Sequence, residues 1–97
     1  MGVVFTLAAR SDLAEAYEFI AQDSQDAATR ALDRLVEVTN QLAAGDLQGS
    51  EVQLTDGRRV RRWSAPPYRV SYRRSTRRLA IVRVYHQSRR PIEQSAL

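Results

Sequence analysis

The stretch YRVSYRRSTRRLAIVRVYH, residues 68–86, decides the fold that this sequence predicts. Its first seven residues alternate between apolar and polar, which is the pattern of a strand with one buried face. The run LAIVRVYH is the most apolar of the predicted strands and is expected at the centre of the sheet. The polar segment STRR between the two strands predicts a hairpin turn. We therefore expect an antiparallel pair in which both tyrosines of the first strand face the core and Arg69 and Arg73 face away.

Upstream of this pair, the chain opens with a short apolar run, VVFTL, which predicts one strand over residues 3–7. From about Ala9 the apolar spacing changes to that of a helix. Leu13 and Tyr17 fall on one helical face, whereas the acidic Asp12 is expected to point elsewhere.

A second helix is predicted after a polar break. Asp23 or Ser24 can cap its N-terminus, and Gly45 stands where a left-handed C-terminal cap is needed. The apolar residues between these points recur at helical spacing and form one inward stripe: Ala27, Ala31, Leu35, Val38 and Leu42. Because few residues separate the two helices, an antiparallel helical hairpin is the natural packing.

The rest of the chain is a turn-rich segment followed by strands. Residues 45–57 are polar, with a short extended piece at 52–54, and RRVRRW then predicts a strand. It ends at SAPP, where the paired prolines bar a helix. The predicted order is β-α-α-β-β-β in a single domain over residues 1–97. This is an α+β fold, in which a helical hairpin packs on one face of a small, largely antiparallel sheet and the other face carries the arginines.

Charge divides the chain into an acidic and a basic part. Residues 1–57 hold three arginines and ten acids, which gives −7, and residues 58–97 hold twelve arginines and one acid, which gives +11. All fifteen basic residues are arginine, whose planar guanidinium binds carboxylates and phosphates in a bidentate manner. A basic face suits anionic partners. A codon bias toward arginine would give the same count without functional meaning.

Several classes of protein are excluded or disfavoured by composition. The absence of cysteine removes disulfides, thiolate nucleophiles and cysteine-based zinc sites, and it suits a reducing, cytoplasmic setting. One histidine with scattered acids makes no convincing metal site, and we expect no cofactor. No apolar run approaches the roughly 20 residues of a membrane-spanning helix, so no membrane association is expected.

Three motifs are informative together: the YR-x-x-Y strand at residues 68–72, the pair His86-x-x-Arg89 at the end of the next strand, and A-x-x-D-L at residues 9–13. In this order and spacing they resemble the RelE/ParE superfamily of bacterial toxins. The resemblance covers nearly the whole chain in the same element order. It implies the toxin of a type II toxin–antitoxin pair, an antitoxin encoded beside it that wraps the toxin, and a hetero-oligomer of the two.

The superfamily contains two activities, and the resemblance leaves both open. RelE-like members are ribosome-dependent mRNA endoribonucleases, whereas ParE-like members poison DNA gyrase without cutting RNA themselves. RNA cleavage needs a proton acceptor, a cation at the phosphate and an acid for the leaving oxygen. The resemblance places Arg69 and Arg89 as phosphate-binding arginines, and His86 is the only residue that could serve as the acid or the base. The chain has no lysine, and Ser95 stands where a RelE-like terminal tyrosine would fall. This incomplete set favours a ParE-like gyrase inhibitor, with the ribosome-dependent nuclease as the alternative.

The predicted partner surface lies on the basic strands and the end of the chain. Trp63 could close the edge of the core or anchor a protein contact, since tryptophan is favoured at interfaces. His86 is expected to share a strand face with Ala80, Val82 and Val84 and to be a partly buried structural residue. A solvated arginine face and a plain nucleic-acid-binding module are the simpler alternatives, although the chain lacks a recognised nucleic-acid-binding motif. The residues expected to contact the target or the antitoxin are Arg61, Trp63, Arg69, Arg73, Arg89 and Arg90.

Overall fold

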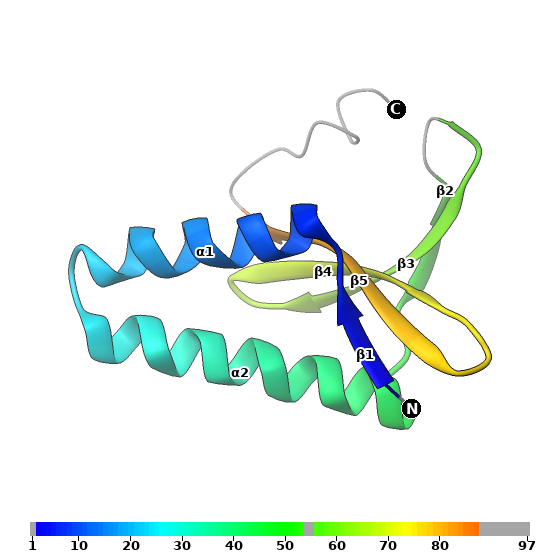
Figure 1. Ribbon diagram of the computed structural model, residues 1–97, viewed down its shortest axis with the longest axis horizontal. Coiled ribbons are helices and arrows are strands. Elements are labelled where there is room, and N and C mark those ends of the chain that lie inside the picture. The colour runs from blue at the N-terminus through cyan, green and yellow to red at the C-terminus, as the bar shows by residue number, and fades with distance from the viewer. Residues whose placement is uncertain (1, 54–55, 88–97) are drawn as a thin grey trace.

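A computed structural model of the chain describes residues 2–53 and 56–87. A helical hairpin packs on one face of a five-stranded sheet whose order is β1-β5-β4-β3-β2 (Figure 1). The α+β fold predicted from the sequence is confirmed, and the predicted short extended piece is the edge strand β2. The elements in chain order are β1 (Gly2–Phe5), α1 (Leu7–Ala21), α2 (Gln25–Ala44), β2 (Ser50–Gln53), β3 (Arg59–Ala65), β4 (Tyr68–Arg74) and β5 (Arg78–His86).

The central strand is β4, and not the more apolar β5 as the sequence predicted. The difference arises because β1 pairs in parallel with the first half of β5, so that β5 lies second from the edge. The remaining neighbours pair antiparallel. The β4–β5 hairpin predicted from residues 68–86 is therefore present. The strand β1 flanks it beside β5, and β3 and β2 continue the sheet beyond β4.

A bulge in β5 changes which residues of this strand face the helices. The pairing with β4 skips Val82, which has no partner opposite it. Cross-strand partners share a face, so Ile81 before the bulge and Val84 and His86 after it all face the helices. The expectation that His86 shares a face with Ala80 is therefore wrong, because the bulge inverts the alternation between them, whereas the expectation that it shares a face with Val84 is confirmed.

The first helix begins at Leu7, two residues earlier than the apolar spacing predicted. Thr6 is its N-cap, and the Oγ1 atom of Thr6 accepts a hydrogen bond from the backbone N–H of Ala9 at 3.1 Å. The same hydroxyl donates to the backbone oxygen of Val82 at 2.8 Å. Thr6 thus ends β1 at Phe5 and ties the start of α1 to the bulge in β5.

The second helix follows its predicted boundaries. The hydroxyl of Ser24 caps the N-terminus by accepting from the N–H of Ala27 at 3.1 Å. Gly45 ends the helix with a φ of 86°, the left-handed conformation that glycine adopts without a steric penalty. Leu35, Val38 and Leu42 of the predicted stripe are buried, which confirms the face that α2 turns toward the sheet.

The core lies between the helices and the strands β1, β5 and β4. Its largest fully buried side chains come from both layers: Tyr72, Leu42, Leu79, Ile81 and Val70. The helices contact mainly β1 and β5, so the end of the sheet formed by β3 and β2 extends past them (Figure 1). No helix within the described residues is long and apolar enough to cross a membrane. This arrangement leaves β3, β2 and the tips of the hairpins to form the surface described next.

Candidate interaction surface

The arginines of the sheet are divided between its two faces. Arg61 pairs across the strands with Tyr72, which is buried beneath the helices, so Arg61 and its alternate neighbour Trp63 lie on the helix-side face. Arg69 and Arg73 alternate with the buried residues of β4 and lie on the opposite face. The prediction that one face carries the arginines is therefore wrong in part, because the alternation of β3 places its odd-numbered arginines on the helix side.

The helix-side arginines hold backbone groups. Arg61 donates from Nη1 to the backbone oxygen of Gly49 at 2.9 Å. Arg74, at the end of β4, donates to the backbone oxygens of Leu42 and Ala43 in the last turn of α2. The carbonyl of Leu42 also accepts from the N–H of Gly45 at 3.2 Å, and a cation is favourable at the negative end of the helix dipole. Arg61 and Arg74 therefore have structural contacts that leave less of their charge for a partner.

The loop before β2 is fixed by both backbone groups of one residue, Gly49. The backbone N–H of Gly49 donates to the hydroxyl of buried Tyr72 at 2.7 Å, while its oxygen accepts from Arg61. A Cβ atom at Gly49 would lie 2.3 Å from the backbone oxygen of Arg62, which is closer than any side chain can come. Only glycine allows this approach. The close contact holds the loop against β3, where the loop forms one wall of a pocket.

That pocket, which we call the cationic pocket, has a volume of about 340 Å³. It opens where the loop before β2 meets β3 and β4, and two arginines and a tryptophan are among its lining residues. Arg69, one of the predicted contact residues, belongs to it, as does Arg62, which the sequence did not single out. The lining residues are Gln48, Gly49, Ser50, Val52, Arg62, Trp63, Ser64 and Arg69.

A second pocket of about 350 Å³, which we call the α2 groove, lies between α2 and β3. Its apolar residues are Val38, Leu47, Trp63 and Ala65, and its polar residues come mostly from the exposed side of α2. Trp63 borders both pockets and also packs against the core. The two alternatives for Trp63, core edge and contact residue, are thus both compatible with its position.

Of the alternative nuclease set, the two residues that the structure describes, Arg69 and His86, lie on opposite faces of the sheet. His86 pairs with Tyr68 on the helix side of the sheet, and the two rings meet edge to face with centroids 5.3 Å apart. Arg69 pairs with Tyr85 on the opposite face. The sheet therefore separates the imidazole of His86 from the guanidinium of Arg69. Arg89 and Arg90 lie outside the described residues.

An ion pair that the sequence did not indicate joins α1 to the bulge. Asp12 accepts from Nε and Nη2 of Arg83 at 2.8 and 3.0 Å, and also from the backbone N–H of Val84 at 2.9 Å. The guanidinium of Arg83 lies 5.0 Å from the ring centre of Tyr85. The expectation that Asp12 points away from the packed face is wrong. The sequence feature that could have indicated this contact is the spacing of three residues between Asp12 and Ala9, which places both on one side of the helix; Ala9 is completely buried.

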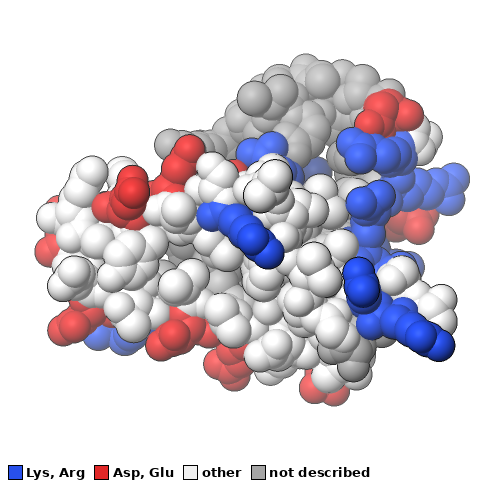
Figure 2. Space-filling model, viewed as in Figure 1, with Lys and Arg blue, Asp and Glu red and all other residues white. Residues whose placement is uncertain are grey.

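Charge is separated along the molecule. Figure 2 shows most of the basic side chains of this view at the sheet end and most of the acidic ones along the helical hairpin. At the tip of the β2–β3 hairpin, however, arginines meet acids: Arg58 lies 2.7 Å from Asp56, and Arg59 lies 3.4 Å from Glu51. Hydrogen bonds from Arg58, foremost from its backbone N–H, lower the pKa of Asp56 below its ordinary value of 3.8. No group of three or more potential ligands for a metal ion occurs in the described part of the chain.

Comparison with known proteins places this arrangement in a family. Residues 3–91 match the ParE toxin of type II toxin–antitoxin system, parDE. The chain therefore belongs to the ParE toxin family. Among solved structures, it resembles one described as a chromosomal ParDE TA system from P. aeruginosa, with a TM-score of 0.69 and 24% identity. That match covers 89% of this chain and 95% of the other, and it shows a shared fold. The comparison with curated proteins gives no match.

Proposed function

We propose that this member of the ParE toxin family arrests bacterial growth by inhibiting DNA gyrase and that a cognate antitoxin neutralises it in the cytoplasm. The observation that carries the proposal is the separation of Arg69 and His86 onto opposite faces of the sheet. A group that takes a proton and a cation that binds the phosphate must reach the same phosphodiester. Two residues separated by the sheet do not meet this requirement, so recognition of a protein target fits the chain better than RNA cleavage.

The antitoxin contact is proposed at the two pockets that meet at Trp63. The α2 groove offers apolar walls beside α2, and the cationic pocket offers two guanidinium groups immediately next to it. A flexible segment with an apolar side chain followed by an acidic one would fill both. Trp63 would be the central anchor, since a tryptophan between two pockets loses the most solvent on binding.

The gyrase proposal is tested with purified components. Relaxed plasmid, gyrase and ATP are incubated with increasing amounts of the chain, and supercoiled and cleaved DNA are measured. The proposal predicts inhibited supercoiling or accumulated cleaved DNA. Unchanged supercoiling at a large excess of folded chain would contradict it.

The antitoxin proposal is tested by binding to the small acidic protein expected from the neighbouring reading frame. Trp63→Ala is predicted to weaken this binding by about 30-fold or more, which corresponds to a hot-spot loss of about 2 kcal/mol. Phe19→Ala is the matched control, because Phe19 is an aromatic residue on α1 that is 66% exposed and borders neither pocket. Equal binding by both variants would remove Trp63 from the contact. The decrease in binding affinity on adding salt would measure how much the charges of the arginines contribute to the binding.

Ribosome-dependent cleavage of mRNA remains the second candidate, because Arg69 lines a pocket and could hold a phosphate. It predicts cut mRNA on translating ribosomes, lost in Arg69→Ala or His86→Ala when circular dichroism shows an intact fold. Growth arrest of the same strength by both folded variants would count against it.

A further inference from the structure

The β4–β5 hairpin ends in a cluster of arginines that neither the pockets nor the fold accounts for. The segment from Arg73 to Arg78 reads RRSTRR, and its residues are all exposed. Arg74 is bound to the end of α2. Arg73, Arg77 and Arg78, which we call the tip arginines, form no ion pair with any acid in residues 2–53 and 56–87. Their charges are therefore uncompensated within the described chain.

The turn holds these arginines in a defined arrangement. The backbone oxygen of Arg78 accepts from the N–H of Ser75 at 2.8 Å and from its hydroxyl at 3.1 Å, which closes the hairpin. Arg73 and Arg78 alternate with residues that face the helices, so both point to the opposite face of the sheet. Diagonal neighbours of this kind have Cβ atoms roughly 7–8 Å apart. Their two guanidinium groups can reach neighbouring anionic groups along one strand of a ligand.

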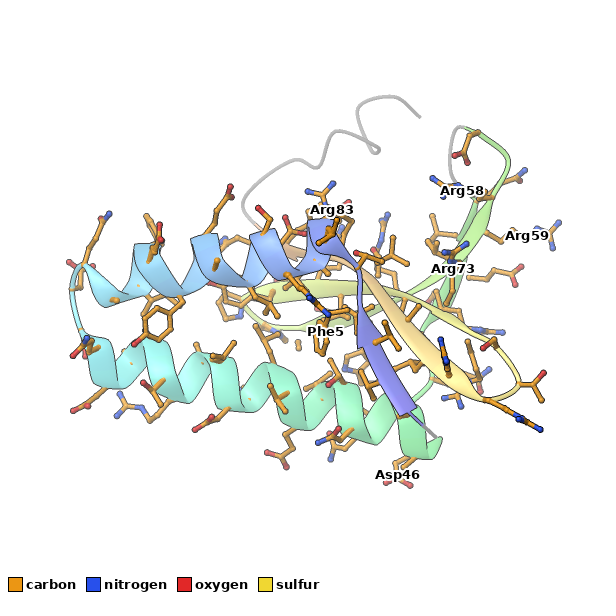
Figure 3. The ribbon with its side chains drawn as sticks, in the orientation of Figure 1. Phe5, Asp46, Arg58, Arg59, Arg73 and Arg83 are labelled. Carbon is orange, nitrogen blue, oxygen red and sulfur yellow. The ribbon has the colours of Figure 1, made fainter. Side chains whose placement is uncertain are left out.

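The neighbouring β2–β3 hairpin provides the contrast. It also carries arginines at its tip, Arg58 and Arg59, but both pair with acids of the same hairpin. Figure 3 shows Arg58, Arg59 and Arg73 at the same end of the molecule, away from the loop that joins the helices. Two adjacent hairpins thus present arginines to the same side, and only one of them leaves the charge free to act on a ligand.

We infer that the tip arginines bind the phosphodiester backbone of nucleic acid without reading its sequence. A protein partner needs an apolar anchor as well as charge, and the six residues of the segment include no apolar side chain. A phosphate backbone needs only cations, hydroxyls and backbone N–H groups, and it is held mainly by electrostatic attraction. The inference concerns a ligand other than the pockets' partner and stands whether or not gyrase is the target.

The test measures binding of the full chain to a fluorescent duplex DNA of mixed sequence, and in a parallel arm to duplex RNA, at several salt concentrations. The variant Arg73→Gln/Arg77→Gln/Arg78→Gln is predicted to bind about 10- to 100-fold more weakly on both duplexes. The slope of log affinity against log salt should become shallower by about 2 to 3, because about one counterion is released per phosphate contact. Circular dichroism and thermal unfolding check that the variants fold as the parent does.

A matched control distinguishes an effect of the tip arginines from an effect of the net charge of the chain. Arg58→Gln/Arg59→Gln removes two arginines from the neighbouring hairpin and is compared with Arg77→Gln/Arg78→Gln, which removes two from the tip. The control is predicted to keep affinity within about twofold, since its arginines are already paired. Equal losses in both double variants, absence of DNA and RNA binding by the parent at low salt, or displacement of DNA by an equally charged polyglutamate peptide would each overturn the inference. If the triple variant lost affinity for only one of the two duplexes, the ligand would be that nucleic acid alone. This result would contradict recognition of the shared phosphodiester backbone.

Discussion

The two faces of the sheet contain the same residue types in different surroundings. On the helix side, the hydroxyl of Tyr72 holds the peptide of Gly49, and Arg74 binds the end of α2. On the opposite face, the hydroxyl of Tyr85 is buried without a hydrogen-bond partner among the described residues, and Arg73 is exposed. The comparison teaches that Tyr72 and Arg74 stabilise the fold through backbone contacts, whereas Tyr85 and Arg73 on the other face make no such contact among the described residues.

The largest difference is expected for apolar side chains. Ile81 is completely buried against the helices, whereas Val4 on the other face is 41% exposed. Ile81→Ala should lower the free energy of unfolding by about 2 to 5 kcal/mol, because it removes transfer free energy and leaves a cavity. Val4→Ala should change it by less than about 1 kcal/mol. Denaturant unfolding measures both, and equal losses would show that the two faces are packed alike.

The next largest effect is expected at the ion pair that joins α1 to β5. Asp12→Ala should cost about 2 to 3 kcal/mol, because the N–H of Val84 and the guanidinium of Arg83 both lose a charged acceptor. Asp12→Asn keeps one acceptor and should cost less. Asp26→Ala, an exposed acid in the first turn of α2, is the control for loss of charge. A cost at Asp12 no greater than that at Asp26 would mean that the ion pair does not fix the helix.

Tyr72 and Tyr85, two of the three buried tyrosines, sharpen the comparison further. Tyr72→Phe should cost about 1 to 2 kcal/mol, because it leaves the buried N–H of Gly49 without its acceptor. Tyr85→Phe should be neutral or slightly stabilising, since it removes a buried hydroxyl that has no hydrogen-bond partner in the described part of the chain. The difference between the two unfolding midpoints is the measurement. The same cost for both would contradict the proposed asymmetry.

The smallest effect is expected for the adjacent arginines of β4. Arg74→Gln should cost about 0.5 to 1 kcal/mol through the lost contact with the C-terminus of α2. Arg73→Gln should leave stability unchanged within about 0.5 kcal/mol, because its side chain is exposed. Thermal unfolding at low and high salt distinguishes them, since the Arg74 contribution should shrink as salt rises. A larger loss for Arg73 would reverse the assignment of the two faces.

The sequence predicted the elements well because their signals are local. Ser24 and Gly45 mark the ends of α2 by their own capping chemistry, and the alternation in β4 assigns its two faces. The position of β4 at the centre could not be predicted in this way, because it depends on β1 joining the sheet from the far end of the chain. The face of His86 was misassigned for a similar reason, since the bulge at Val82 depends on pairing with β4 and on Thr6.

The candidate site was only partly accessible to sequence reasoning. Arg61, Trp63, Arg69 and Arg73 were selected for their residue types, and their roles in binding remain predictions. Their division between two faces became visible only in the register of the strands. The sequence does not indicate Arg62, although it lines the cationic pocket, because its residue type and position in RRVRRW do not distinguish it from the neighbouring arginines. The difference between the paired and unpaired hairpin tips likewise depends on which acids reach them.

The most direct test of the central claim, that this toxin acts on gyrase and does not cut RNA, is a parallel titration of one protein preparation. The chain is added over the same concentration range to a gyrase supercoiling reaction and to translating ribosomes carrying a labelled mRNA. The account predicts inhibited supercoiling or cleaved plasmid DNA, with the mRNA intact at every concentration. Cut mRNA together with unaffected gyrase would contradict it.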